Sequence, residues 1–132
     1  MTTLTPGSVR FDGVVKKFGD VTALKSLDLT IHPGKLVTLL GPSGCGKTTT
    51  LRLIAGLEMA TSGNIHIGGE DVTHLTATYR KVSMVFQSYA LFPHMTVREN
   101  VAYGLTVKSM PKREAAEKAE HGLELVGLSG FG

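Results

Sequence analysis

Tryptophan is absent from the sequence, cysteine occurs once, and aromatic residues make up only 6% of the chain. A single cysteine cannot form a disulfide within the chain, which excludes a disulfide-stabilised secreted scaffold and favours a reducing cytosol. No apolar run approaches the roughly 18 residues that a membrane-spanning helix needs. The first eight residues also lack the basic and apolar segments of a secretory signal. We therefore expect one soluble cytosolic domain within these 132 residues.

The chain also has only a small excess of charge of one sign: it contains 14 Lys and Arg residues and 11 Asp and Glu residues, for a net charge of +3. Two basic pairs, at 16–17 and 80–81, have no stacking aromatic residues interleaved, so nucleic acid is not an expected partner. The five histidines do not show zinc-ligand spacing. Glycine, in contrast, is abundant at 16 residues, well above the usual share of about 7%.

Hydrophobic periodicity predicts strands in the N-terminal part of the chain. Apolar residues alternate with polar ones near Val9 and Phe11 and again over 27–31, as in half-buried strands, with turns predicted at 16–20 and 32–34. Residues 65–67 and 72 flank Gly68–Gly69, which indicates a short hairpin or bend.

Two other apolar runs, at 36–40 and 82–86, are nearly continuous. Such runs are typical of parallel strands that are buried on both faces.

Three helices are predicted after the strands begin. Lys47–Leu57 reads as a helix that closes near Gly56. Thr96 and Glu99 have capping-box spacing, which predicts a helix through about residue 105. Pro111 begins a third helix that ends at about residue 127, with Glu114 and Lys118 spaced for an ion pair. The residues expected on its inner face are Ala115, Ala116, Ala119, Leu123 and Val126.

The segment Gly41–Thr48 matches G-x-x-x-x-G-K-[ST] without a mismatch. Small residues let successive backbone N–H groups curl around phosphate oxygens, and the following helix points its positive end at them. Lys47 would bring a mobile charge to the phosphates, and the Thr48 hydroxyl can bind Mg²⁺. The alternative is a glycine-rich connection without a ligand.

Cys45 lies inside this loop and has two interpretations. It is either a reactive thiol at the helix N-terminus or a small side chain in a crowded loop, and we favour the second. Gly41 and Ser43 also begin the nucleophile-elbow pattern G-x-S-x-G, but position 45 is not glycine, so a serine hydrolase of the nucleophile-elbow type is excluded.

Two long segments together carry a family resemblance. GPSGCGKTTTLRLIAGLE, at 41–58, and VFQSYALFPHMTV, at 85–97, resemble ABC transporter ATP-binding subunits, in particular those of importers for polyamines, ferric iron, sugars or phosphonates. The resemblance covers the chain from Val9 onward. It implies an α/β fold: a P-loop NTPase core with an N-terminal antiparallel β portion and the start of a helical subdomain. After a short tail at 1–8, residues 9–132 would be the N-terminal part of the ATP-binding domain, with the P-loop at 41–48, the Q-loop around 87 and the helical subdomain from about 96.

The resemblance also implies roles for individual residues. Phe18 would stack on adenine, although it could be an ordinary turn or core aromatic. Gln87 would contact Mg²⁺ and position the attacking water, although it could be a surface glutamine; with Lys47 it would be catalytic. Thr48 and Gln87 would hold Mg²⁺. The nucleotide would contact Phe18 and the loop residues Gly41, Ser43, Gly44, Cys45, Gly46, Lys47, Thr48 and Thr49.

The implied partners are proteins. Ser88–Val97 resembles the segment that meets a transmembrane permease, and a second ATP-binding subunit would pair head to tail with the first. The chain would work in the cytoplasm, on the inner face of the cell membrane. The apolar residues of this segment could equally be core, and we expect an even division between the two roles among Tyr89, Leu91, Phe92 and Met95.

The chain departs from the family pattern near its end. Leu128-Ser-Gly130 mimics the start of the signature, but Phe131-Gly132 follows, and no apolar run ends in an acidic pair. We therefore expect this chain to be the N-terminal part of a larger ATPase. By itself, the chain is expected to bind ATP and not to hydrolyse it. The alternatives are a truncated, non-hydrolysing nucleotide-binding module and another P-loop enzyme such as a small-molecule kinase. The 87–97 segment and the lack of an arginine-rich lid disfavour the kinase.

Overall fold

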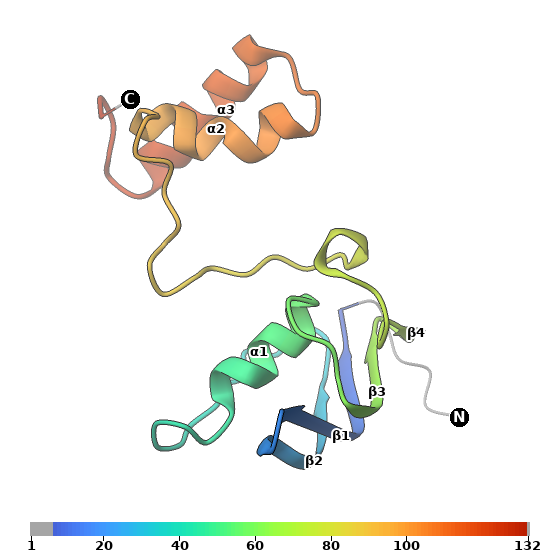
Figure 1. The fold of residues 1–132 in the computed structure, drawn as a ribbon. Helices are drawn as coiled ribbons and strands as arrows, with labels where there is room; N and C mark the ends of the chain where they lie inside the picture. The colour runs from blue at the N-terminus through green and yellow to red at the C-terminus, as the bar shows by residue number, and fades with distance from the viewer. Residues whose placement is uncertain (1–6, 132) are drawn as a thin grey trace. The chain divides into compact units, whose positions relative to one another are not determined.

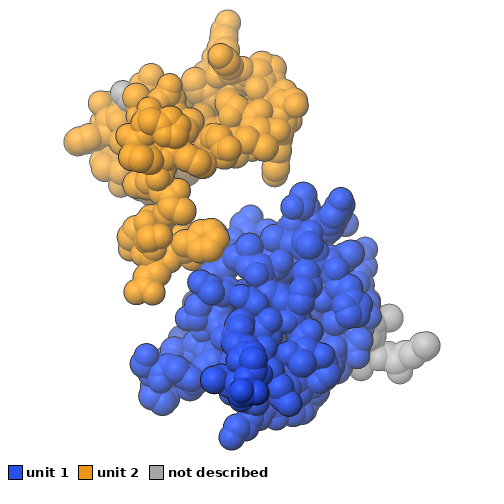
Figure 2. All heavy atoms as spheres, in the orientation of Figure 1, with its two compact units in different colours: residues 1–84 blue, residues 85–132 orange. Residues whose placement is uncertain are grey.

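The computed structural model describes residues 7–131 (Figure 1). Contacts divide the chain into two compact units, unit 1 up to Met84 and unit 2 from Val85 onward (Figure 2). Of the predicted tail at 1–8, residues 1–6 lie outside the described residues. Ser8 is buried, and its carbonyl accepts a hydrogen bond of 2.9 Å from the Gly68 N–H. Ser8 therefore packs within unit 1.

Unit 1 is built on a four-stranded antiparallel sheet with the order β2-β1-β3-β4. Its strands are β1 (Val9–Phe18), β2 (Val21–Ile31), β3 (Ser62–Ile67) and β4 (Glu70–Asp71). The predicted hairpin at Gly68–Gly69 is confirmed, because it joins β3 to β4.

The predicted turn at 16–20 was too long. Lys16 and Lys17 pair with Leu24 and Thr22 of β2, so β1 continues to Phe18 and only residues 19–20 turn.

One helix packs on the sheet of unit 1. This helix, α1 (Lys47–Ala55), ends at Gly56 as predicted. A short 3₁₀ helix, η1 (Ala77–Tyr79), follows β4. The core between α1 and the sheet consists of Phe11, Val14, Leu24, Leu53, Ile65 and Val72. Burying such side chains stabilises the folded chain by about 1.5–3 kcal/mol each.

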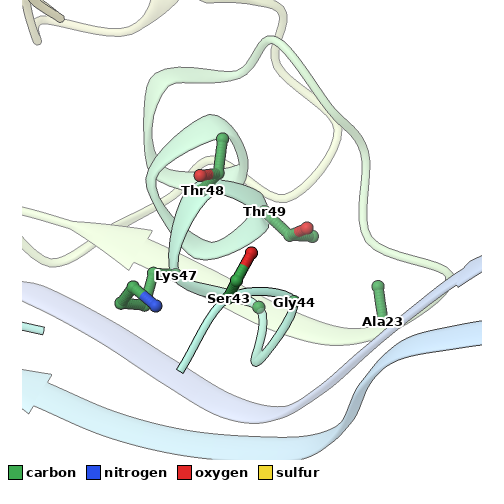
Figure 3. Close-up of a pocket in the computed structure, with 7 residues that line it drawn as sticks. Ala23, Ser43, Gly44, Lys47, Thr48 and Thr49 are labelled. Carbon is green, nitrogen blue, oxygen red and sulfur yellow. The ribbon is translucent and has the colours of Figure 1, made fainter. Parts of the chain in front are cut away.

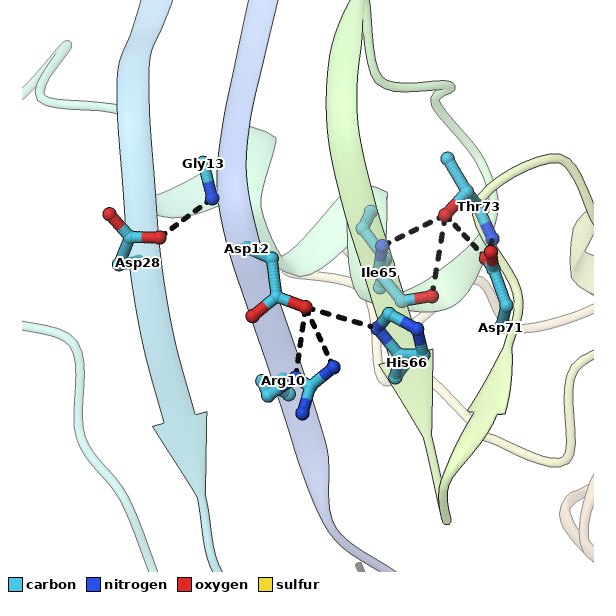
Figure 4. A network of polar contacts seen from close by, with 8 residues as sticks. All are labelled: Arg10, Asp12, Gly13, Asp28, Ile65, His66, Asp71 and Thr73. Atoms are coloured by element: carbon cyan, nitrogen blue, oxygen red, sulfur yellow. Dashed lines mark hydrogen bonds and ion pairs between the residues drawn. The ribbon is translucent and has the colours of Figure 1, made fainter. Parts of the chain in front are cut away.

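Polar contacts tie the strands together beside this core (Figure 4). The Asp28 carboxylate of β2 accepts a hydrogen bond of 2.7 Å from the Gly13 N–H of β1. The Thr73 hydroxyl accepts one of 2.9 Å from the Ile65 N–H and donates one of 2.6 Å to the Asp71 carboxylate. The hydroxyl bond to Asp71, together with one of 2.9 Å from the Thr73 N–H, holds the pKa of Asp71 below its ordinary value. The loop after β4 is thereby fixed to β3.

Unit 2 contains two helices, α2 (Val97–Val107) and α3 (Lys112–Leu125). They pack through a seam of small residues, Ala102 with Ala115 and Ala119. The predicted capping box is confirmed, since Thr96 and Glu99 exchange side-chain and backbone hydrogen bonds.

Of two predictions for α3, one is confirmed and one was wrong. The Glu114–Lys118 ion pair is confirmed at 3.0 Å. The inward placement of Val126 was wrong, because α3 ends at Leu125 and Val126 is 68% exposed.

The predicted parallel strands at 36–40 and 82–86 are not strands in the structure. Leu36 is 98% exposed, Leu40 is 88% exposed and Val85 is 82% exposed. A parallel strand needs hydrogen-bonded neighbours on its edges, and every strand pair among the described residues is antiparallel. These runs are apolar, as buried strands are, but none of the described strands pairs with them.

Candidate functional site

The glycine-rich loop at 41–46 leads directly into α1, and its shape depends on close backbone approaches. Gly46 has a φ of 94°, and a Cβ atom there would lie 2.6 Å from Leu24 Cδ2 and 3.0 Å from the Ala23 oxygen. A Cβ atom at Gly41 would lie 2.5 Å from Cys45 Sγ. Gly46 therefore excludes a side chain, because its φ is left-handed and the backbone oxygen of Ala23 is close. At Gly41 the Cys45 side chain would have to move to admit one.

A cavity of about 440 Å³ opens beside this loop (Figure 3). It is lined by Ala23, Ser43, Gly44, Gly46, Lys47, Thr48 and Thr49. The loop and the first turn of α1 thus bring together most of the residues predicted to hold the nucleotide. Ala23 was missed, because its place beside the loop arises from the β1–β2 hairpin and a lone alanine has no sequence signal.

Lys47 bends back over its own loop. Its Nζ donates hydrogen bonds of 2.6 Å to the Gly41 carbonyl and 2.7 Å to the Pro42 carbonyl, and it lies 3.4 Å from Cys45 Sγ. The ammonium group is therefore held by neutral acceptors at the mouth of the loop. Phosphate oxygens would be stronger partners than these carbonyl groups, because they add the attraction between opposite charges.

The N-terminal end of α1 carries partial positive charge, which adds to the charge of the Lys47 ammonium group. The Thr50 N–H is the first to bond within the helix, to the Gly46 carbonyl at 2.8 Å. The amides of residues 47–49 precede that bond and have no acceptor within the helix. The first turn of α1 contains no acidic residue, and no carboxylate lines the cavity among residues 7–131. An anion is thus the ligand that this cavity fits best.

Phe18 lies at the end of β1 and is not among the residues that line the cavity. Its ring is 46% exposed, and Lys16 Nζ lies 4.5 Å from the ring centroid. The same ammonium forms a 2.9 Å ion pair with Glu58. The ring is therefore available at the surface and is anchored through a cation–π contact.

Gln87 belongs to unit 2, where it is exposed at the start of a turn over 87–90. The four apolar residues beyond it were expected to divide evenly between core and surface, and they do not. Tyr89 is 75% exposed, Leu91 is 70% exposed and Phe92 is 36% exposed, while only Met95 is half-buried. This segment consequently presents more apolar surface than a core assignment allows.

Comparisons with known proteins agree with this geometry. The family described as ABC transporter matches residues 24–132. The Fe(3+) ions import ATP-binding proteins FbpC of Brucella abortus (strain 2308) and Agrobacterium fabrum (strain C58 / ATCC 33970) are 69% and 66% identical over 132 residues. These alignments cover all of this chain and 37% of each relative, so the chain spans little more than a third of their length.

Solved structures resemble the fold as well. The dimeric structure of a post-hydrolysis state of the ATP-binding cassette MJ0796 bound to ADP and Pi matches with a TM-score of 0.81 and 32% identity. The match covers 93% of this chain and 59% of that one.

None of the helices in residues 7–131 is long and apolar enough to cross a membrane. The α/β P-loop fold, with its antiparallel β portion and helical part, is confirmed by the solved cassettes. By its loop, its fold and the family match over most of its length, the chain belongs to the ABC transporter family.

Proposed function

We propose that this chain is the nucleotide-binding part of an importer ATP-binding subunit, which couples Mg·ATP binding and hydrolysis to solute uptake. The observation that carries the proposal is the position of Lys47, whose ammonium group sits at the mouth of an anion-accepting loop. The relatives that are 65–69% identical over the whole chain are named as Fe(3+) import proteins. Ferric ion is therefore the solute that we propose.

Different residues of the site would bind different parts of the nucleotide. The loop amides and the Lys47 ammonium group would bind the phosphates, with the Ser43 and Thr49 hydroxyls beside them. Thr48 and Gln87 would hold Mg²⁺, which neutralises charge on the phosphate oxygens when it is bound. Phe18 would stack on the adenine, because a half-exposed ring is free to do so. Gln87 would also orient the attacking water, since its amide can both donate and accept hydrogen bonds.

The proposed protein partners are a transmembrane permease and a second ATP-binding subunit, placed on the inner face of the cell membrane. Residues 88–97, here called the docking segment, would meet the permease. The exposure of Tyr89 and Leu91 supports this, because surface apolar clusters mark interaction sites.

We further propose that the 132-residue chain alone binds ATP without hydrolysing it. Phosphoryl transfer needs a carboxylate to hold the metal ion beside the phosphates. The cavity at the loop is lined by glycine, alanine, hydroxyl-bearing residues and Lys47. None of the described residues that line it is acidic.

Substitution of Lys47 tests the site. Lys47→Ala should weaken ATP binding about tenfold or more, because a hydrogen bond to a charged group contributes roughly 1.5–3 kcal/mol. Titration with a fluorescent ATP analogue would measure the dissociation constant. Lys35→Ala, at an exposed turn position, is the matched control and should leave binding unchanged. Equal affinity in the Lys47 variant would refute the proposed site.

A further inference from the structure

Asn100 lies at the end of the first turn of α2, and its side chain points back to the docking segment. Its Oδ1 accepts a hydrogen bond of 2.9 Å from the Phe92 N–H. Its Nδ2 donates to the carbonyl oxygens of Phe92 at 3.1 Å, Met95 at 3.1 Å and Thr96 at 3.0 Å. One amide group thus contacts backbone atoms of three residues across the second half of the segment.

Only an amide satisfies this arrangement. The group must accept from one N–H and donate to carbonyl oxygens, and the Asn side chain carries both functions at fixed positions. The reversed amide would place N–H against N–H, which defines its orientation. An aspartate of the same shape would keep the bond to the Phe92 N–H and place a carboxylate against three carbonyl oxygens.

The rest of the local structure supports the same shape. The Met95 N–H donates to the Phe92 carbonyl at 3.1 Å, which closes a turn with Pro93 at its second position. The Phe92 ring packs against Tyr103 of α2, with 4.5 Å between ring centroids. Phe92 is therefore fixed to α2 through both its backbone and its ring while more than a third of it stays exposed.

We propose that Asn100 is a positioning residue for permease docking: it holds residues 92–96 in the shape that the permease binds. This inference rests on the proposed function of the docking segment. Its physical basis is preorganisation, because a loop that is already ordered loses less conformational entropy on binding. Asn100 would act through the segment and would not itself touch the permease.

The test uses the complete ATP-binding subunit that contains this sequence, titrated onto its permease in nanodiscs. Asn100→Asp and Asn100→Ala should each weaken permease binding about tenfold or more. Lys108→Gln is the matched control, since it changes the charge by the same amount as Asn100→Asp at the exposed far end of α2. It should bind as the unsubstituted subunit does.

Amide hydrogen exchange adds a readout that general destabilisation would not move. The Phe92 amide should exchange faster in Asn100→Ala than in Asn100→Asp, because the aspartate keeps the acceptor, while the amides at the centre of α3 stay equally protected. If Asn100→Asp fails to fold, Asn100→Ala introduces no charge and provides the same binding test.

The outcomes separate the two proposals. Permease binding that is weakened in both Asn100 variants and unchanged in Lys108→Gln supports the inference. Equal binding by all variants, or an unchanged Phe92 exchange rate in Asn100→Ala, overturns it and leaves the proposed function intact. Absence of permease binding by the unsubstituted subunit overturns the proposed function and the inference together.

Discussion

At the scale of single residues, Arg80 shows how much one buried side chain can organise. It is 5% exposed, and burial lowers the pKa of its guanidinium group. That group donates to the Leu53 carbonyl, to the Ile54 carbonyl at 3.2 Å and to the Leu75 carbonyl at 2.8 Å. A cation at the C-terminal end of α1 also complements the helix dipole. In the sequence, Arg80 was only half of an unremarkable basic pair.

We predict that Arg80→Met lowers the free energy of unfolding of unit 1 by about 3 kcal/mol. The substitution removes the side-chain donor from the carbonyl groups of Leu53, Ile54 and Leu75. A buried carbonyl group that is left unsatisfied costs roughly 1–3 kcal/mol. Urea denaturation followed by circular dichroism would measure it. Arg52→Met is the control, because Arg52 lies in the last turn of the same helix and is exposed. A similar effect of both substitutions would show that the buried contacts of Arg80 contribute little.

At the scale of elements, the start of α2 is held by a reciprocal cap. The Glu99 carboxylate accepts a hydrogen bond of 2.7 Å from the Thr96 N–H, and the Thr96 hydroxyl accepts one of 3.2 Å from the Glu99 N–H. The first of these bonds holds the pKa of Glu99 below its ordinary value. A depressed carboxyl pKa means that the ionised form is the one that stabilises the folded state.

The cap should therefore depend on pH. Its contribution is complete above the ordinary glutamate pKa of about 4.3 and is lost as the pH falls through the lower value of the folded state. We expect the helical carbon chemical shifts of the first turn of α2 to move toward coil values on acidification below about pH 4.

Two variants control this prediction. Glu99→Gln keeps the capping acceptor without a titratable group, so its first turn should not respond to acid. Thr96→Ala removes the reciprocal acceptor and should weaken the helix start at all pH values, by about 1 kcal/mol. An acid response that persists in Glu99→Gln would assign the effect to another group.

At the scale of the whole molecule, the proposed nucleotide binding and the hydrolysis of ATP place different demands on the chain. The proposed phosphate-binding loop lies beside a cavity, and none of the described residues that line this cavity is acidic. Purified chain with Mg·ATP is therefore expected to release no phosphate above background. A sensitive phosphate assay would check this, with Lys47→Ala as the blank for contaminating enzymes. Sustained release that disappears in Lys47→Ala would show that other residues of the chain supply the missing function.

The sequence by itself determined those features that depend on neighbours along the chain. The loop at 41–48, the helix after it, the Gly68–Gly69 hairpin and the Thr96–Glu99 cap were all predicted, because each arises from local backbone chemistry. Phe18 and Gln87 were predicted only from a family resemblance, since a single aromatic or amide side chain has no sequence pattern of its own. Their roles stay predictions.

The tertiary structure decided what depends on distant partners. The runs at 36–40 and 82–86 have the composition of buried strands, but a strand forms only where another edge pairs with it. Arg80 and Asn100 gained their roles from carbonyl groups that folding brings to them, up to 27 residues away along the chain for Arg80. Local propensity is written in consecutive residues, whereas hydrogen-bond partners and burial exist only once the chain has folded.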